Sequence, residues 1–237
     1  KYSIRDIHKF PSQLSAEDIL IRSSNIGSLM IGRKVGEEKL KFFFQKLGFL
    51  KTINFELEEL GKPLSFNWEK CKLETVSYGH GITTTPLQAA TAYASITNGG
   101  YTVNPTLDLE KKKNIRSNKS IISKSTSDQI NKILRKVVTD KEGTGSFADI
   151  FGYDVGGKTG TAKSYTNGNK NINTFISIFP TKKPKYVLLI ILDDPKAAPH
   201  ITYNYRGQQI KNILRNEAGW NSVYVAGKII QKIGPIL

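Results

Sequence analysis

The sequence has 237 residues and few of the features that indicate a metal site, a disulfide or a membrane-spanning segment. Its single cysteine, Cys71, excludes an internal disulfide and a cysteine-based zinc cluster, and we expect it to be buried as a small hydrophobic side chain. His8, His80 and His200 have no metal-ligand spacing, so we predict no metal site and no cofactor. No apolar run approaches the ~20 residues of a membrane span, and the N-terminal residues lack the apolar centre of a signal peptide.

Acidic residues are also few, with 20 Asp and Glu against 35 Lys and Arg and a net charge of +15. This surplus would suit nucleic acid, anionic lipid or an anionic polymer. The lysines are scattered, however, which is typical of an ordinary solvated surface, and we predict no nucleic-acid partner. A hydrophobic content of 38% is enough for one large domain or two small ones. Because the first residue is not methionine, we expect the chain to be part of a longer protein.

The segment GYDVGGKTGTAK, residues 152–163, supports two incompatible interpretations. With Gly152 as the first glycine and Gly157-Lys158-Thr159 as the end, it matches a phosphate-binding Walker A loop. With Lys158-Thr159-Gly160 as the core, it is the KTG box of penicillin-binding proteins and serine β-lactamases, which lies on a strand. Only one of the two can be correct.

The surroundings of Lys158 favour a strand. A phosphate loop follows a buried strand and opens a helix, whereas the residues after Lys158 are rich in Gly and Asn and have no helical period. The apolar run 186–194 resembles a Walker B strand, but too little chain lies between it and Lys158 for a helical crossover. We therefore predict three antiparallel strands near 158–163, 174–179 and 186–192, joined by hairpins.

Five segments carry helix signals. Two have a capping residue at the start, Ser15 with Asp18 and Thr85 followed by Pro86. The others show apolar residues at helical spacing: 36–48, with Gly48 as its left-handed cap, a helix capped by Ser125 and Asp128, and 222–233.

Four segments in order resemble the transpeptidase domain of class B penicillin-binding proteins, above all the septal cell-division transpeptidase. They are Ser23-Ser24-Asn25-Ile26-Gly27, the stretch from Tyr78 to Gly100, VGGKTGTA from Val155, and the stretch from Ala218 to Leu237. The resemblance covers nearly the whole chain. It implies an α+β penicillin-binding fold, an antiparallel sheet packed by helices, with residues 1–237 as the C-terminal portion of the domain.

The resemblance also implies roles for individual residues. Ser23 and Asn25 would form the SxN box on a loop, and Ser23 and Lys158 would help move the proton of the nucleophile while Asn25 holds the substrate backbone. Thr159 and Thr161 would bind the terminal carboxylate of a D-Ala-D-Ala stem peptide.

Further roles follow from the same resemblance. The N–H of Thr161 would donate into an oxyanion hole, and Gly160 would leave room for the bound peptide. Lys163, Tyr203 and Tyr205 would add a basic contact and an aromatic wall.

One motif of the family is missing. Its nucleophile lies in a Ser-x-x-Lys box upstream of the SxN box, and no Ser-x-x-Lys occurs in these 237 residues. The acyl-forming serine and its lysine, with two strands and the central helix of the family's sheet, are therefore expected in a preceding segment.

We therefore expect a serine-type peptidoglycan D,D-transpeptidase of septal wall synthesis, bound by β-lactams, of which this chain alone is inactive. The resemblance implies the periplasmic side of the bacterial inner membrane, an upstream anchor, and membrane proteins of the division machinery as partners. The alternative is a non-catalytic scaffold that keeps the fold, and a Ser-x-x-Lys box in the full gene separates the two.

Overall fold

The computed structural model describes residues 3–57, 61, 63, 67–69, 71–111, 116–164 and 170–237. The chain divides into two compact units, Lys1–Ile130 and Asn131–Leu237. Within the described residues, no helix is both long enough and apolar enough to cross a membrane.

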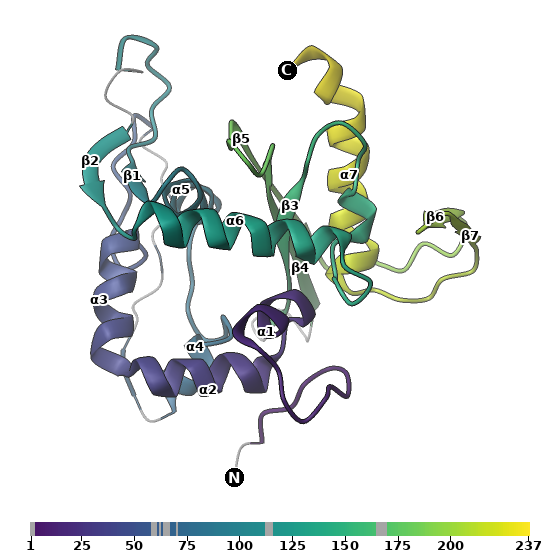
Figure 1. Ribbon diagram of the computed structural model, residues 1–237, viewed down its shortest axis with the longest axis horizontal. Coiled ribbons are helices and arrows are strands. Elements are labelled where there is room, and N and C mark those ends of the chain that lie inside the picture. Colours follow the sequence, from purple (N-terminus) through teal and green to yellow (C-terminus); the bar gives the residue numbers. More distant parts are fainter. Residues whose placement is uncertain are drawn as a thin grey trace. The chain divides into compact units, whose positions relative to one another are not determined.

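The first unit is mainly helical (Figure 1). Its elements are α1 (Ala16–Arg22), α2 (Asn25–Val35), α3 (Glu37–Leu47), α4 (Lys72–Val76), α5 (Pro86–Thr97) and the antiparallel pair β1 (Tyr101–Val103) and β2 (Arg116–Ser120). The capping box predicted at Ser15 and the cap predicted at Thr85 are confirmed. Each side-chain oxygen accepts from the third helical N–H, and the backbone N–H of each cap donates in return to the side chain of that third residue. Gly48 takes the predicted left-handed conformation at the end of α3, with φ of 79°.

Helices α1 and α2 are joined at a sharp junction and pack closely. Gly27, in the first turn of α2, lies so near α1 that a Cβ there would come within 2.5 Å of the Ile19 side chain. Ile19 and Ile21 are buried. This close approach fixes where the residues between the two helices lie.

Helix α6 (Lys124–Thr139) continues from the first unit into the second. The predicted caps Ser125 and Asp128 are wrong, since the helix begins one residue after Ser123, whose hydroxyl accepts from the N–H of Thr126 at 3.1 Å. Ser125 lies inside the first turn, and Asp128 pairs with Lys124 instead. Four hydroxyl residues lie within positions 123–127, so the cap pattern alone does not select among them.

The second unit is built on the sheet β3 (Gly156–Ser164), β4 (Lys170–Phe179) and β5 (Tyr186–Asp193). The strands are antiparallel in the order β3-β4-β5, with Lys158 opposite Ile176 and Thr161 opposite Asn173. The remaining elements are η2 (Ser146–Ala148), β6 (Tyr203–Tyr205), β7 (Gln208–Ile210), η3 (Ala218–Trp220), α7 (Ser222–Ile233) and η4 (Gly234–Ile236). The three predicted strands and the final helix are confirmed.

This topology excludes the phosphate-loop interpretation. Lys158 lies within strand β3, which continues to Ser164, and the next element among the described residues is the antiparallel strand β4. A phosphate loop needs a helix N-terminus directly after the lysine. The KTG interpretation is the one compatible with the structure.

Helix α7 covers one face of the sheet (Figure 1). Val223, Ala226 and Ile230 of α7 are fully buried in one core with Phe175 and Phe179 of β4. A buried side chain of this kind contributes about 1.5–3 kcal/mol. This packing holds β4, and β3 bonded to it, against α7.

Cys71 is exposed, so the prediction that it is buried is wrong. It precedes α4 with φ of 67°, a left-handed conformation that marks the end of a connecting segment rather than the inside of an element. A cysteine has no turn signal of its own, and its usual burial misled the sequence interpretation.

Candidate active site

The predicted SxN box forms the junction between α1 and α2. Ser23 ends α1 in the left-handed conformation, with φ of 59°, and its N–H donates to the Ile19 carbonyl. Ser24 caps α2, accepting from the N–H of Gly27 at 2.9 Å, and Asn25 is the first residue of α2. The triplet therefore lies in a tight turn between two helices rather than in an open loop.

Asp6 holds this turn, and sequence reasoning missed it. Its carboxylate accepts from the N–H of Asn25 at 2.6 Å, from the N–H of Ile26 at 3.1 Å and from the Ser24 hydroxyl at 3.0 Å. The side-chain amide of Asn25 donates to the carbonyl of Arg5 at 3.0 Å. A carboxylate at a helix N-terminus satisfies free N–H groups and complements the helix dipole. Asp6 thus fixes Ser24 and Asn25 together.

Lys158 lies on β3 and is half-buried. The Nζ atom donates to the carbonyl of Thr159 at 3.0 Å. Burial of the ammonium lowers the pKa of Lys158 to about 8, since an apolar surrounding disfavours the charged form. A lysine with such a pKa can take up and release a proton near neutral pH.

Thr159 and Thr161 lie on the other face of β3, because side chains alternate along a strand. The hydroxyls of Thr159 and Thr144 form a hydrogen bond of 2.7 Å. The hydroxyl oxygen of Thr161 accepts from the N–H of Ala218 at 3.1 Å, and the residue is exposed. Both threonines are therefore held in fixed rotamers by groups outside the strand.

Gly160 is restricted by the strand beside it. A Cβ at this position would come within 2.5 Å of the Thr174 hydroxyl, so the sheet itself disfavours a side chain here. Lys163 lies at the exposed end of the same strand.

Tyr203 lies elsewhere. It is only 4% exposed and packs in an aromatic cluster with Phe147, Trp220 and Tyr224. Burial raises the pKa of its phenol, and Tyr224 adds to this effect. Tyr205 stacks on Trp220 at the edge of the same cluster. These positions favour a packing role for Tyr203 and leave it little surface for a bound peptide.

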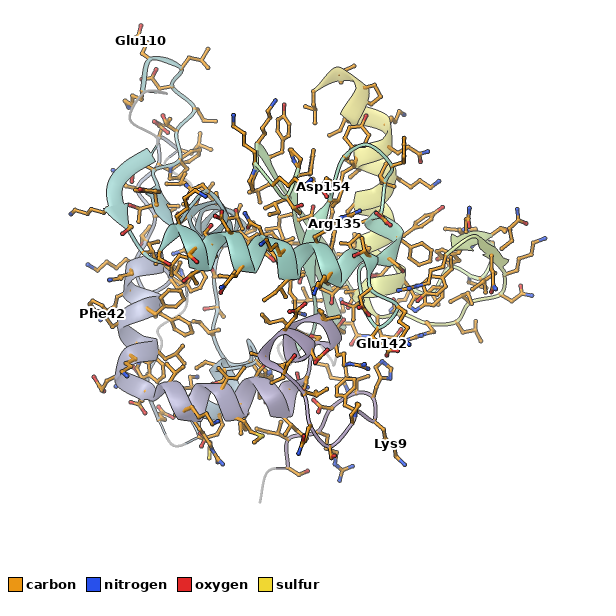
Figure 2. The ribbon with its side chains drawn as sticks, viewed as in Figure 1. Lys9, Phe42, Glu110, Arg135, Glu142 and Asp154 are labelled. Carbon is orange, nitrogen blue, oxygen red and sulfur yellow. The ribbon has the colours of Figure 1, made fainter. Side chains whose placement is uncertain are left out.

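A second missed residue, Arg135 of α6, holds the segment that leads into β3. Its guanidinium donates to the Val155 carbonyl at 2.8 Å and pairs with Asp149 at 2.8 Å and with Asp154 at 3.1 Å. Figure 2 shows Arg135 and Asp154 pointing toward each other. Asp154 also accepts from the Thr181 hydroxyl at 2.6 Å. The start of the KTG strand is therefore fixed by a planar, multiply bonded cation.

Comparison with known proteins identifies the family. The model of the penicillin binding protein transpeptidase domain matches residues 1–217. The chain belongs to the penicillin-binding protein transpeptidase family. The predicted resemblance to class B transpeptidase domains is confirmed.

Named relatives and solved structures agree with this membership. The chain is 32% identical to the "Probable peptidoglycan D,D-transpeptidase FtsI" of Caulobacter vibrioides over 99% of its length, which is 40% of that protein. It is 31% identical to the "Probable peptidoglycan D,D-transpeptidase PenA" of Neisseria gonorrhoeae over 89% of its length and 37% of that protein.

The fold also matches a structure of the same class. Over 93% of this chain and 65% of that chain, it aligns with the transpeptidase domain of penicillin-binding protein 3 from Burkholderia pseudomallei, with a TM-score of 0.75 and 22% identity. The predicted α+β penicillin-binding fold is confirmed. The chain spans about two fifths of the length of the curated relatives it matches.

Proposed function

We propose that the protein is a peptidoglycan D,D-transpeptidase that cross-links stem peptides during septal wall synthesis and is acylated by β-lactams. The observation that carries this is the KTG strand, which presents Lys158, with a pKa of about 8, on one face and two threonines with held hydroxyls on the other. Relatives at 31–32% identity carry the name peptidoglycan D,D-transpeptidase.

In this proposal a serine outside these 237 residues attacks the carbonyl between the two D-alanines. The C–N bond breaks, D-alanine leaves as an amine after gaining a proton, and an ester to the serine remains. The amine of a second stem peptide then attacks the ester, restoring the serine hydroxyl and forming the cross-link. Splitting the transfer into two steps lowers each barrier.

The residues of this chain would bind the peptide and move the proton. Lys158 and Ser23 belong to the proton network of the nucleophile, and Asn25 holds the substrate backbone. Thr159 and Thr161 bind the terminal carboxylate, and the N–H of Thr161 donates to the oxyanion of the tetrahedral intermediate. Gly160 keeps the strand clear for the peptide, and Lys163 supplies an additional positive charge.

The setting of this reaction is part of the proposal. Peptidoglycan stem peptides lie on the periplasmic side of the inner membrane, and an upstream segment would anchor the protein there. Membrane proteins of the division machinery are the proposed partners.

The proposed function is tested with the intact protein and a stem pentapeptide ending in D-Ala-D-Ala. We expect release of D-alanine and cross-linked dimers, both detected by mass spectrometry and both blocked by benzylpenicillin. A tripeptide stem without the D-alanines serves as the control donor. Absence of D-alanine release and of penicillin acylation in the folded intact protein would contradict the proposal.

A non-catalytic scaffold is the second candidate. The observation that favours it is the absence of a Ser-x-x-Lys box from these 237 residues. The intact protein then binds division partners or glycan without reacting with penicillin, so the same experiment separates the two functions.

A further inference from the structure

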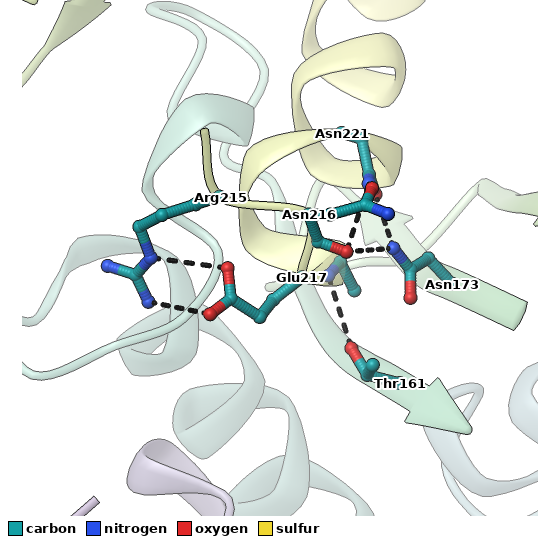
Figure 3. Close-up of polar contacts among 7 residues, drawn as sticks. Thr161, Asn173, Arg215, Asn216, Glu217 and Asn221 are labelled. Carbon is teal, nitrogen blue, oxygen red and sulfur yellow. Dashed lines mark hydrogen bonds and ion pairs between the residues drawn. The ribbon is translucent and has the colours of Figure 1, made fainter. Parts of the chain in front are cut away.

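Three asparagines form a hydrogen-bonded cluster next to Thr161 in the second unit (Figure 3). Asn173 on β4 is fully buried and lies opposite Thr161 in the strand ladder. Its Nδ2 donates to the Asn216 carbonyl at 2.7 Å and to Oδ1 of Asn221 at 3.1 Å. Nδ2 of Asn221 donates to Oδ1 of Asn216 at 2.9 Å. Each asparagine is thus bonded to the other two.

The cluster holds both ends of the short segment that contains Ala218. Asn216 precedes Ala218 by two residues, and Asn221 caps α7 by accepting from the N–H of Ser222 at 2.6 Å. The Ser222 hydroxyl, itself buried, donates to the Ala218 carbonyl at 3.1 Å. With both ends held, the N–H of Ala218 reaches the Thr161 hydroxyl oxygen at 3.1 Å.

This contact has a chemical consequence for Thr161. Because its oxygen accepts from Ala218, the hydroxyl proton points elsewhere and is free to be donated to a ligand. A hydroxyl that accepts one hydrogen bond is also a better donor, since hydrogen bonds in a chain polarise one another. Thr161 is exposed, so an anionic group can reach it.

The choice of asparagine at position 173 supports this role over simple packing. Oδ1 of Asn173 is buried and has no hydrogen-bond partner within the part of the chain that the structure describes. Such a group lowers stability, and leucine, of similar size, would avoid that loss. The donated bonds to Asn216 and Asn221 therefore account for the residue better than burial does.

We propose that Asn173, Asn216 and Asn221 are positioning residues for substrate recognition. They hold the Ala218 amide against Thr161 and so orient the Thr161 hydroxyl as a donor to the terminal carboxylate of the substrate. This inference rests on the proposed function, which assigns carboxylate binding to Thr161.

The contact between the Ala218 amide and the Thr161 hydroxyl can be tested without an activity assay. Amide hydrogen exchange in the 237-residue chain measures it. Asn216→Ala and Thr161→Val should each speed exchange of the Ala218 amide about tenfold or more while the Phe175 amide stays protected. Asn204→Ala, at an exposed position of the same unit, is the control and should change neither. Unchanged Ala218 protection in both variants would overturn the proposal. Asn173→Leu is a further variant of the same cluster. Should it fail to fold, the result for Asn216→Ala, which lies at a half-buried position, is the one that decides.

The role in recognition is tested in the intact protein with benzylpenicillin, which carries a carboxylate, and its methyl ester, which does not. Asn216→Ala should slow acylation by benzylpenicillin about tenfold and leave the ester rate within about twofold. On a Thr161→Val background Asn216→Ala should have no further effect, because residues that act through one contact are not additive. On a Thr161→Ser background, which keeps the hydroxyl, Asn216→Ala should again slow acylation by benzylpenicillin.

The inference is overturned if Asn216→Ala slows acylation by benzylpenicillin and by its methyl ester equally. It is also overturned if the rate losses from Asn216→Ala and Thr161→Val multiply in the double variant, because either result shows a merely structural role. If the unsubstituted protein is acylated by neither probe, the proposed function fails and the carboxylate role falls with it. The exchange rate of the Ala218 amide still decides separately whether the asparagines hold Ala218 against Thr161.

Discussion

The Ser23–Asn25 turn of the first unit and the Lys158–Lys163 strand of the second are supported in opposite ways. In the turn, one carboxylate, Asp6, accepts hydrogen bonds from three successive residues. The strand is bonded along its whole length to β4 and held further by Arg135, Thr144 and Ala218. A single substitution should therefore loosen the turn, whereas the strand should keep its shape when one side chain is changed.

The largest expected effect separates chemistry from structure on the strand. In the intact protein, Lys158→Ala should slow penicillin acylation about 10²-fold or more, as loss of one preorganised polar group typically does. Because the strand has many other contacts, the variant should still fold. The measurement is the acylation rate with labelled penicillin, and Lys185→Ala, an exposed lysine of the same unit, is the control. A near-normal rate in the Lys158 variant would remove this residue from the mechanism.

The turn should respond to Asp6→Ala with a loss of about 2 kcal/mol in the free energy of unfolding, as expected for hydrogen bonds to a charged group. Urea denaturation of the 237-residue chain measures this. Asp6→Asn keeps an acceptor of the same shape and should lose less. If the alanine and asparagine variants both match the unsubstituted chain, the turn does not depend on Asp6.

A smaller effect is expected at the entrance to α1, ahead of the turn. Ser15→Ala removes the N-cap of α1 and should lower the free energy of unfolding by about 1 kcal/mol. Thr85→Ala, the matching change at α5, should cost about the same. The comparison with Asp6→Ala, again by urea denaturation, shows whether the nonlocal carboxylate matters more than a local cap; equal losses would contradict that ranking.

A pH dependence of stability is also expected from Lys158. Its pKa in the folded chain is about 8, below the ordinary value of 10.5. Between these pH values the unfolded chain binds more protons, so this residue makes stability rise with pH across that window. Lys158→Met removes the contribution and should be the more stable form at pH 7. Thermal unfolding of both chains should show the gap narrowing from pH 8 to pH 10.5, and a constant gap would contradict a lowered pKa.

Local patterns were enough to predict much of the fold. The helix caps at Ser15 and Thr85, the hairpin strands and α7 depend on residues a few positions apart, so the sequence predicts them directly. The pairs β1–β2 and β6–β7 have strands as short as three residues, which is too short for a periodic signal. They were not predicted.

The candidate site was predictable only in its motifs. Asp6 reaches the turn from 18 to 20 positions upstream, and Arg135 and Ala218 reach the strand from other elements. Tertiary packing creates these contacts, and no short spacing marks them. Tyr203 shows the converse, since the family resemblance implies an aromatic wall but the side chain packs inside its own unit.

The central claim is that this chain supplies the substrate-binding residues of a transpeptidase whose nucleophile lies outside these 237 residues. Labelling with fluorescent penicillin, followed on a denaturing gel, tests it most directly. The account predicts a stoichiometric band for the intact protein and none for the 237-residue chain, because acylation needs an activated serine. A stoichiometric band on the chain alone, competed by unlabelled drug, would contradict the account, and Ser23 would be the first residue to examine as the nucleophile.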